Sequence, residues 1–275
     1  MKHIICFSGG HSSALVAMEV VRKYGRENVI LVNHDINETV ESPDVKRFKR
    51  EIATALGLKI TYANMKDVEN KDQFDVSVEA KAFRTKSVPA ICTSRLKTQP
   101  FILWLKENVN PEHDVIYYGF DQSEPERISR RKSIMTDMGY KTDYPLANWD
   151  SLFYESSEDI CVEKPLQYNN FKHANCIGCI KGGKQHWYIV YCLRPDIFNK
   201  AKETETSIGF SILKEKKKPI FLKDLECTFD KMKRLGVEPT EHIHSQRFWA
   251  DTAKLLKEPS LENYEEFIKP CMCTT

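Results

Sequence analysis

Short apolar runs alternate with longer amphipathic segments along the first half of the chain. The runs are rich in Ile, Val and Tyr and occupy residues 3–7, 28–33, 59–63 and 115–120. Continuous apolar runs of this length are typical of strands that are buried on both faces of a parallel sheet. The alternation of strand and helix patterns therefore predicts an α/β fold, namely a doubly wound parallel sheet with helices on both faces.

The segments between the runs have helical character. Residues 14–23 follow the turn 8–13 after the first run, and a segment from Ser42 to Leu56 begins with Ser-Pro-Asp and stops at Gly57. These are ordinary start and stop signals of a helix. Further helices are predicted at residues 76–83 and 98–108, and a charged segment at 124–139 follows the fourth run.

The lysine-rich segment 214–218, followed by Pro219, predicts a boundary in the chain. Residues 1–213 would form the sheet domain. Residues 219–275 would form a small, mostly helical C-terminal appendage and tail, with short helices at 221–235 and 251–256.

The turn after the first run has the composition of an anion site. It reads Ser8-Gly9-Gly10-His11-Ser12-Ser13 and leads straight into a helix. Glycines allow close backbone approach, serine hydroxyls donate hydrogen bonds, and a helix N-terminus attracts negative charge. The spacing matches neither G-x-x-x-x-G-K-[ST] nor G-x-G-x-x-G. The turn predicts a site for a nucleotide phosphate or pyrophosphate, and the competing interpretation is an ordinary tight turn.

Charge and hydropathy exclude several classes of protein. The chain has 41 Lys and Arg against 39 Asp and Glu, a formal net charge of +2, so no global field favours nucleic acid or anionic lipid. A local groove remains an alternative at Arg127, Arg130, Arg131 and Lys132. The sequence shows neither a membrane span nor a secretory signal, and we expect a cytoplasmic protein without a membrane partner.

Nine cysteines in such a chain indicate reduced thiols, metal ligands or redox groups. Cys176-Ile177-Gly178-Cys179 is a C-x-x-C knuckle, which supplies half of a four-ligand site. Cys92 and Cys161 are the favoured further ligands because of their loop settings, and His173 is a weaker candidate. The residues leave zinc, an iron-sulfur cluster and separate metal-free thiols as alternatives.

Polar residues near the predicted strand ends could complete a nucleotide site. Asp35 follows the second run and could bind a ribose or base, whereas Lys97, Arg127 and Arg131 could bind phosphates. The predicted site thus combines a glycine loop, one acid and several cations at one sheet edge.

Five segments in collinear order resemble the phosphoadenosine-phosphosulfate reductase family, within the adenine nucleotide α-hydrolase-like or PP-loop superfamily. They are Ser8 to Ser13, Asn33-His34-Asp35, the segment 92–100 (CTSRLKTQP), the segment 119–124 (GFDQSE) and the segment 144–149 (YPLANW). The resemblance spans roughly the first 200 residues. It implies a PP-loop domain at 1–213 and an adenosine nucleotide, either ATP or phosphoadenosine phosphosulfate, as ligand.

The same resemblance implies roles for individual residues. Ser8, Gly9, Gly10, Ser12 and Ser13 would hold pyrophosphate or phosphosulfate, Asp35 would lie near the adenosine, and Lys97 and Arg127 would contact phosphate or sulfate. Cys92, Cys176 and Cys179 match in place the cysteines of the iron-sulfur members. A tail cysteine, here Cys271 or Cys273, would be the catalytic nucleophile, and a thiol partner would be the reductant.

The chain departs from the family pattern in three ways. Thr93 replaces one cluster cysteine, so Cys161 or another donor would be needed and zinc becomes a rival. Ser12 replaces the aspartate of the ATP-pyrophosphatase motif, which disfavours magnesium-assisted adenylation. Cys271 and Cys273 lack the E-C-G-[LI]-H context of the reductase tail.

The sequence therefore predicts a reductase-like oxidoreductase that acts on a sulfonucleotide or a related adenine nucleotide. The first alternative is a PP-loop ATP pyrophosphatase that adenylates a substrate, as in nucleic-acid thiolation or base modification, where magnesium would accompany ATP. The second alternative is a non-catalytic nucleotide-binding module.

Overall fold

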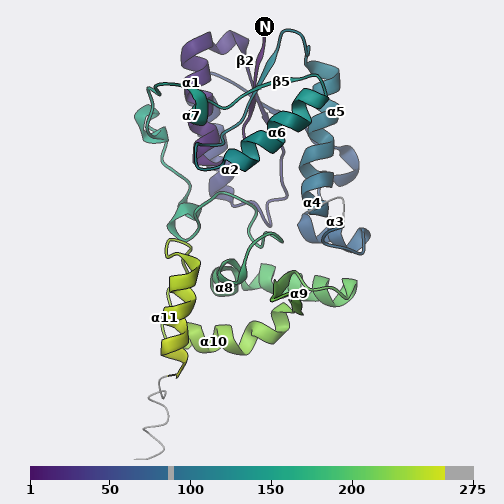
Figure 1. Ribbon diagram of the computed structural model, residues 1–275, viewed down its shortest axis with the longest axis vertical. Helices are drawn as coiled ribbons and strands as arrows, with labels where there is room; N and C mark the ends of the chain where they lie inside the picture. The colour runs from purple at the N-terminus through teal and green to yellow at the C-terminus, as the bar shows by residue number, and fades with distance from the viewer. Residues whose placement is uncertain (86–89, 258–275) are drawn as a thin grey trace, which may run out of the picture.

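A five-stranded parallel sheet forms the upper part of the molecule in Figure 1, and the order of its strands is β3-β2-β1-β4-β5. The computed structural model describes residues 1–85 and 90–257. The strands are β1 His3–Cys6, β2 Val29–Asn33, β3 Ile60–Tyr62, β4 Val115–Tyr117 and β5 Lys141–Asp143. The predicted α/β class with a parallel sheet is confirmed, and four of the strands fall on the apolar runs.

The central strand β1 pairs with β2 on one side, where His3 lies opposite Val29, and with β4 on the other, where His3 lies opposite Val115. The chain moves outward through β2 and β3, then returns across β1 to β4 and β5. The strand order therefore reverses between β1 and β4. In open parallel sheets this reversal opens a crevice at the carboxyl ends of the strands, where ligands bind.

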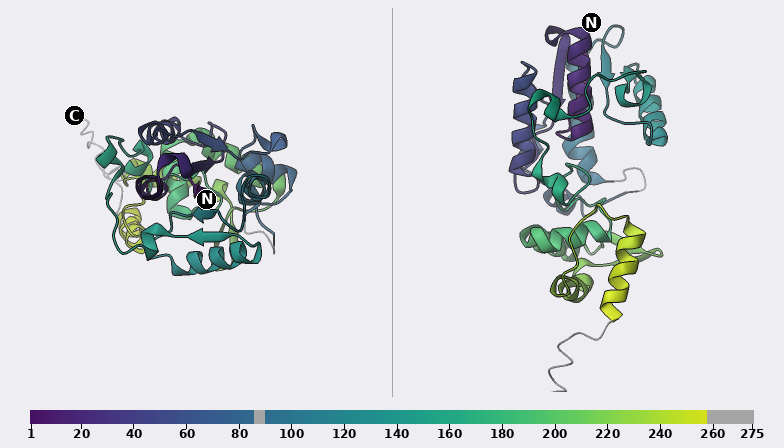
Figure 2. Two further views of the ribbon diagram at one scale, coloured as in Figure 1. Left: turned by 90° about the horizontal axis from the view of Figure 1, so that it is seen from above. Right: turned by 90° about the vertical axis from the view of Figure 1, so that its left-hand side faces the viewer.

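Helices cover both faces of the sheet, as the view from above in Figure 2 shows. One face is covered by α1 His11–Tyr24 and α2 Pro43–Ala55, which pack on alternate residues of β1 and β2 such as Ile5 and Leu31. The other face carries α5 Gln99–Asn108 and α6 Pro125–Asp137, which pack on Ile4 and Ile116. Alternate side chains of one strand thus enter two separate cores.

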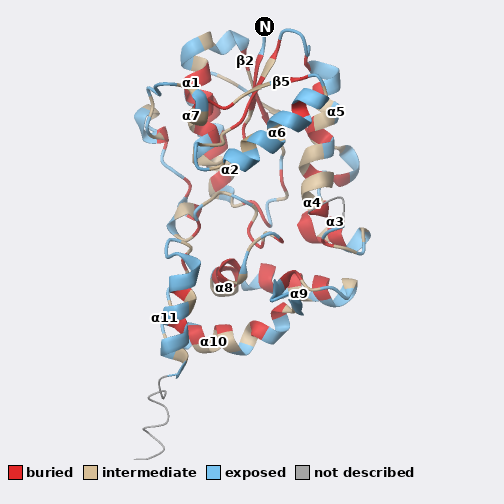
Figure 3. Cartoon of the chain, viewed as in Figure 1, coloured by how far each residue is buried: buried red, intermediate tan, exposed pale blue. Residues whose placement is uncertain are grey.

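A second body of helices lies below the sheet in Figure 1. Its helices are α8 Lys184–Leu193, α9 Pro195–Ile208, α10 Glu226–Arg234 and α11 Ser245–Lys257. They share one apolar core with α3 Gln73–Glu79, and this core contains Trp187, Phe198 and Phe229. Figure 3 shows buried residues on each of these helices.

The lysine-rich segment that predicts a boundary lies in an antiparallel hairpin of β6 Leu213–Glu215 and β7 Lys218–Ile220. Two further short helices are α4 Ile91–Thr93 and α7 Pro145–Asn148. Within the part of the chain described, no helix has the length and apolar character needed to cross a bilayer. The candidate nucleophiles Cys271 and Cys273 lie outside the described residues.

Candidate functional site

The glycine loop connects β1 to α1 at the carboxyl edge of the sheet. Gly9 has a φ of +81°, a backbone conformation that residues with a side chain rarely adopt. A Cβ atom at Gly9 would lie 2.8 Å from Cγ and Cδ of Lys49. The loop therefore needs glycine at this position both for its conformation and for its packing on α2.

The N-cap residue of α1 provides no side-chain cap. Gly10 is the N-cap residue, and the hydroxyl of Ser13 donates to the Gly10 carbonyl at 2.8 Å. The Ser8 N–H and hydroxyl both donate to Ser13 Oγ at 3.2 Å, and the side chain of Ser12 is exposed. Because the first N–H groups of a helix have no partner within the helix, this end is suited to an anion.

Tyr168 marks the position that an anion would take. Its hydroxyl accepts a hydrogen bond from the His11 N–H at 3.0 Å, in the first turn of α1. The same hydroxyl would lie 3.4 Å from a Cβ atom at Gly10. A second hydrogen-bonding side chain therefore reaches the loop from residues 166–169, a short 3-10 helix far along the chain.

The loop after β4 contacts the first turn of α1. A Cβ atom at Gly119 would lie 3.0 Å from the backbone of Ser12 and Ser13. Glycine thus allows the two loops beside the strand-order reversal to touch. Arg127, in the first turn of α6, lies 4.3 Å from the ring centroid of Phe120 and pairs with Glu124, so it stands on the β4 side of this edge.

A buried ion pair supports the loop from the β2 side. Lys49 is 1% exposed, and its Nζ donates to Glu41 Oε2 at 2.8 Å and to Asn33 Oδ1 at 3.0 Å. Burial lowers the pKa of Lys49, and the charge of Glu41 acts against this shift. Asp35, the residue predicted to contact adenosine, forms an ion pair with Lys46 at 2.8 Å. Its carboxylate is therefore bound to a neighbouring cation.

His34 at the end of β2 gives the protein an expected acid sensitivity. Burial lowers its pKa from 6.5 to about 4, and its Nδ1 donates to the Ala63 carbonyl at 2.7 Å. Between these two values the unfolded chain binds a proton that the native protein does not bind. Stability therefore falls as the pH falls from 6.5 to 4, by up to about 3 kcal/mol from this residue.

The variant His34→Asn keeps a donor toward Ala63 and cannot titrate. We expect urea unfolding at several pH values to show a smaller loss of stability between pH 6.5 and 4 in this variant than in the unmodified chain. His113, whose side chain is 69% exposed, provides the matched control His113→Asn. Equal acid sensitivity in all three proteins would contradict the prediction.

Three of the four predicted cysteine ligands come together. Cys92 at α4 and the two knuckle cysteines lie close enough to influence one another's ionisation. Burial, then Cys179 and Cys176, raise the pKa of Cys92 to about 11. Lys97 Nζ lies 4.0 Å from Cys176 Sγ, and mainly because of that thiol its pKa is raised. Lys97 therefore belongs to the cysteine site as the structure places it.

The knuckle is fixed by tight packing. Gly178 has a φ of +71°, and a Cβ atom there would lie 2.5 Å from Ile197 Cγ2 on α9. The Ile177 N–H donates to the Val40 carbonyl at 2.8 Å, next to Glu41. Val40, in the loop between β2 and α2, thus contacts the knuckle. The next residue, Glu41, binds Lys49 of α2, and Lys49 packs against Gly9 of the glycine loop.

The fourth predicted ligand, Cys161, is exposed and follows the 3-10 helix Ser157–Ile160, which lies against α1. Its φ of 59° sets it in a left-handed turn. Cys176 and Cys179 shift the pKa of Cys92, whereas Cys161 does not contribute to that shift. The structure therefore gives no observation that joins Cys161 to the other three thiols.

The spacing of the thiols bears on the kind of group they could hold. Sulfur ligands of one zinc ion stand about 3.8 Å apart, because each Zn–S bond is about 2.3 Å. Among the described residues, the group of three ligand atoms that all lie within 4.8 Å of one another is His173, His186 and Glu241, and no such group of cysteines occurs. The described thiols therefore do not form a ready-made three-ligand group of the size that one zinc ion needs.

Comparison with family models, curated proteins and solved structures finds no match. The parallel sheet of order 3-2-1-4-5 agrees with a Rossmann-like or nucleotide α-hydrolase fold, and this is the level at which the structure supports the resemblance.

Sequence reasoning missed several residues of this region. Glu41 and Lys49 look like ordinary surface charges in the sequence, and Tyr168 lies far along the chain from the loop that it contacts. Gly119 belongs to the segment 119–124 (GFDQSE), but the sequence does not indicate its contact with α1. Each of these roles depends on tertiary contacts, for which a local pattern carries no signal.

Proposed function

We propose that the protein is an enzyme that binds an adenosine nucleotide at the loop Ser8–Ser13 and carries out sulfur chemistry on it, as a reductase similar to the phosphoadenosine-phosphosulfate reductases. The observation that carries the proposal is the N-terminus of α1, which its N-cap glycine leaves without a side-chain cap, beside the strand-order reversal, with a thiol and lysine site linked to it through residues 40 and 41. This placement supports the proposal, because phosphate binding and cysteine chemistry would then occur close to one edge of the sheet.

Different residues of the chain would bind the phosphate, the adenosine and the cluster. The N–H groups at the start of α1 and the hydroxyls of Ser8, Ser12 and Ser13 would bind the phosphate or pyrophosphate, and Arg127 would approach from the β4 side. Asp35 would turn from Lys46 toward the adenosine. Cys92, Cys176 and Cys179 would hold an iron-sulfur cluster, which would keep these thiols ionised, and the neighbouring Lys97 would supply positive charge near a sulfate group.

The sulfur step would need a thiolate, and Cys271 or Cys273 is the proposed source. The thiolate would attack the sulfate sulfur, form a cysteine S-sulfonate and release the adenosine phosphate. A thiol reductant would then attack the cysteine sulfur, form a disulfide and release sulfite. The two electrons that reduce the sulfur come from the two thiols, so the atoms and electrons balance.

A second candidate is a PP-loop ATP pyrophosphatase that adenylates a substrate. It is favoured by the tail, because Cys271 and Cys273 lack the sequence context of a reductase nucleophile. The exposed Ser12, in place of an aspartate that could bind magnesium, is consistent with the third candidate, a nucleotide-binding module without catalysis.

Anaerobic purification followed by iron, zinc and sulfide analysis and product assays tests these candidates. We expect iron with acid-labile sulfide, both lost in Cys176→Ser and retained in Cys192→Ser, a change on α8 outside the three-thiol site. With phosphoadenosine phosphosulfate and a dithiol we expect sulfite. Pyrophosphate from ATP in the presence of substrate would support the second candidate instead, and nucleotide binding without any product would support the third.

A further inference from the structure

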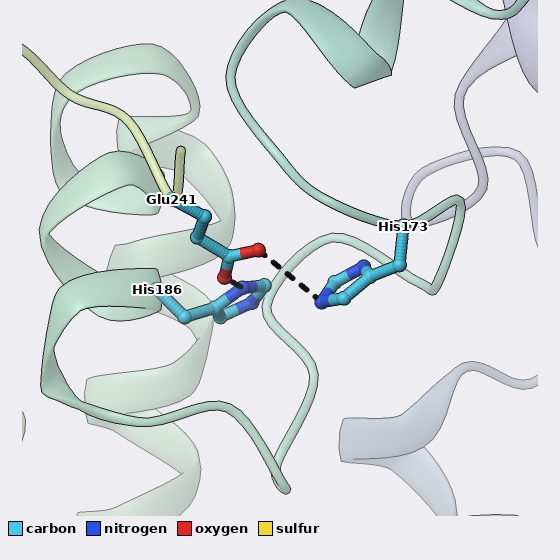
Figure 4. Close-up of side chains that lie close together, drawn as sticks. All are labelled: His173, His186 and Glu241. Atoms are coloured by element: carbon cyan, nitrogen blue, oxygen red, sulfur yellow. Dashed lines mark hydrogen bonds and ion pairs between the residues drawn. The ribbon is translucent and has the colours of Figure 1, made fainter. Parts of the chain in front are cut away.

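The carboxylate of Glu241, between α10 and α11, lies between two imidazoles (Figure 4). Its Oε1 is 3.1 Å from Nδ1 of His186, in the first turn of α8, and its Oε2 is 3.5 Å from Nε2 of His173. Glu241 is half-buried and His186 is buried. The three side chains come from segments on both sides of the cysteine knuckle.

The other nitrogen of each ring faces a backbone N–H. His186 Nε2 accepts from the Cys179 N–H at 3.2 Å, and His173 Nδ1 accepts from the Asn175 N–H at 3.4 Å. Because a backbone N–H can only donate, both of these nitrogens must present a lone pair. In the neutral rings the protons then lie on the nitrogens that face Glu241: its Oε1 accepts from His186 at 3.1 Å, and its Oε2 lies 3.5 Å from Nε2 of His173.

This pattern is that of a hydrogen-bond network rather than a cation site, although the three ligand atoms all lie within 4.8 Å of one another. A neutral imidazole that binds a metal carries its proton on the opposite nitrogen, where a carboxylate or carbonyl normally accepts it. Here the opposite nitrogens of His173 and His186 meet N–H donors. Metal binding would place two hydrogens against each other at both positions.

We propose that Glu241 is a positioning residue for the knuckle: through His173 and His186 it holds the backbone N–H groups at the two ends of the segment from Asn175 to Cys179. Asn175 precedes the first thiol and Cys179 carries the second. The network thus lets the C-terminal helical part of the chain set the geometry of the two thiols. The inference rests on the proposed function in taking these thiols as ligands of the iron-sulfur cluster.

The variant Glu241→Gln tests the inference with little change in size. Its amide presents one NH₂ group to a ring N–H, so that ring must change tautomer and lose its backbone hydrogen bond. We expect the thiol beside that ring, Cys176 for His173 or Cys179 for His186, to be alkylated by N-ethylmaleimide about three- to tenfold faster, the effect of losing one hydrogen bond. Peptide mass spectrometry on the reduced, metal-free protein measures the rate at each thiol. Rates at Cys92 and Cys6 should stay unchanged.

Glu238→Gln is the matched control, because Glu238 is exposed in the same segment. A second variant, His173→Ala, removes a half-exposed ring and one arm of the network. It should accelerate Cys176 and leave Cys179 at its original rate. This residue-specific pattern is not expected from a general loss of stability, which thermal unfolding of each variant would measure separately.

Two results would overturn the inference. The first is a Glu241→Gln protein in which Cys176 and Cys179 react as in Glu238→Gln, or in which Cys6 accelerates equally. The second is Co²⁺ binding to the triple variant Cys92→Ser, Cys176→Ser, Cys179→Ser that is lost when Glu241→Gln is added, because the cluster would then be a cation site. Nucleotide affinity is measured independently, so failure of the proposed function would leave the alkylation pattern interpretable.

Discussion

The variant Glu41→Leu is expected to lower the free energy of unfolding by about 3–5 kcal/mol, because it leaves the ammonium group of Lys49 buried without its counter-charge. Lys49 is 1% exposed, and Glu41 Oε2 lies 2.8 Å from its Nζ. Asn33 would remain as a partner at 3.0 Å, but an amide oxygen cannot replace the lost charge. Urea unfolding near neutral pH measures the effect.

The double variant Glu41→Leu, Lys49→Met separates the charge from the packing. The unbranched methionine side chain at position 49 keeps the packing contact with Gly9, and no isolated charge remains. Most of the lost free energy of unfolding should therefore return. Glu51→Gln, at an exposed ion pair with Arg47, is the control and should cost less than about 1 kcal/mol. A single Glu41→Leu change as mild as this control would contradict the account of the buried pair.

The sheet could be predicted wherever the strands are apolar. Runs such as 115–120 are buried on both faces, so burial and sequence pattern agree. The edge strand β5, by contrast, reads Lys-Thr-Asp and pairs with β4 alone. Its place depends on hydrogen bonds to a neighbour and not on hydrophobic side chains, so the apolar pattern does not reveal it.

The lysine-rich segment shows a second limit. Lys216 and Lys217 form the turn of the β6–β7 hairpin with φ values of 47° and 69°. Asn and Gly are the usual residues of such turns, so the composition indicates a linker instead. The hairpin forms because Leu213 on β6 and Leu222 after β7 reach the helical core, which is a tertiary effect.

The candidate site divides in the same way. The glycine loop and the C-x-x-C knuckle are local devices, since their chemistry requires particular residues at fixed spacing, and both stand out in the sequence. A loop setting in the sequence favours Cys161 as a ligand, but it carries no information on the distance to the other thiols. The supporting residues Lys49 and Glu241 act through contacts across the fold, and only the structure brings them to the site.

The variant Gly10→Asp is expected to weaken adenosine-nucleotide binding by about a hundredfold or more while the protein stays folded, because it puts a carboxylate where the phosphate would bind. Gly10 has a φ of −90° and a ψ of 158°, an extended conformation open to any residue. Its Cβ would meet Tyr168 Oη at 3.4 Å and Ser8 Oγ at 3.6 Å, which are ordinary contacts. The aspartate side chain, at the N-cap position of α1, can therefore accept hydrogen bonds from the first N–H groups of the helix.

Stability and binding should then move in opposite directions. Aspartate is among the best N-cap residues, so thermal unfolding of Gly10→Asp should be unchanged or shifted upward. Gly10→Asn caps the same N–H groups without charge and should bind nucleotide more tightly than Gly10→Asp, whereas Gly10→Ala adds only the Cβ atom. Calorimetric titration of ATP and of adenosine 3′,5′-bisphosphate into the three variants measures the order. Full affinity in Gly10→Asp would mean that the phosphate lies elsewhere, since a carboxylate at the N-terminus of α1 and a bound phosphate cannot share the same donors.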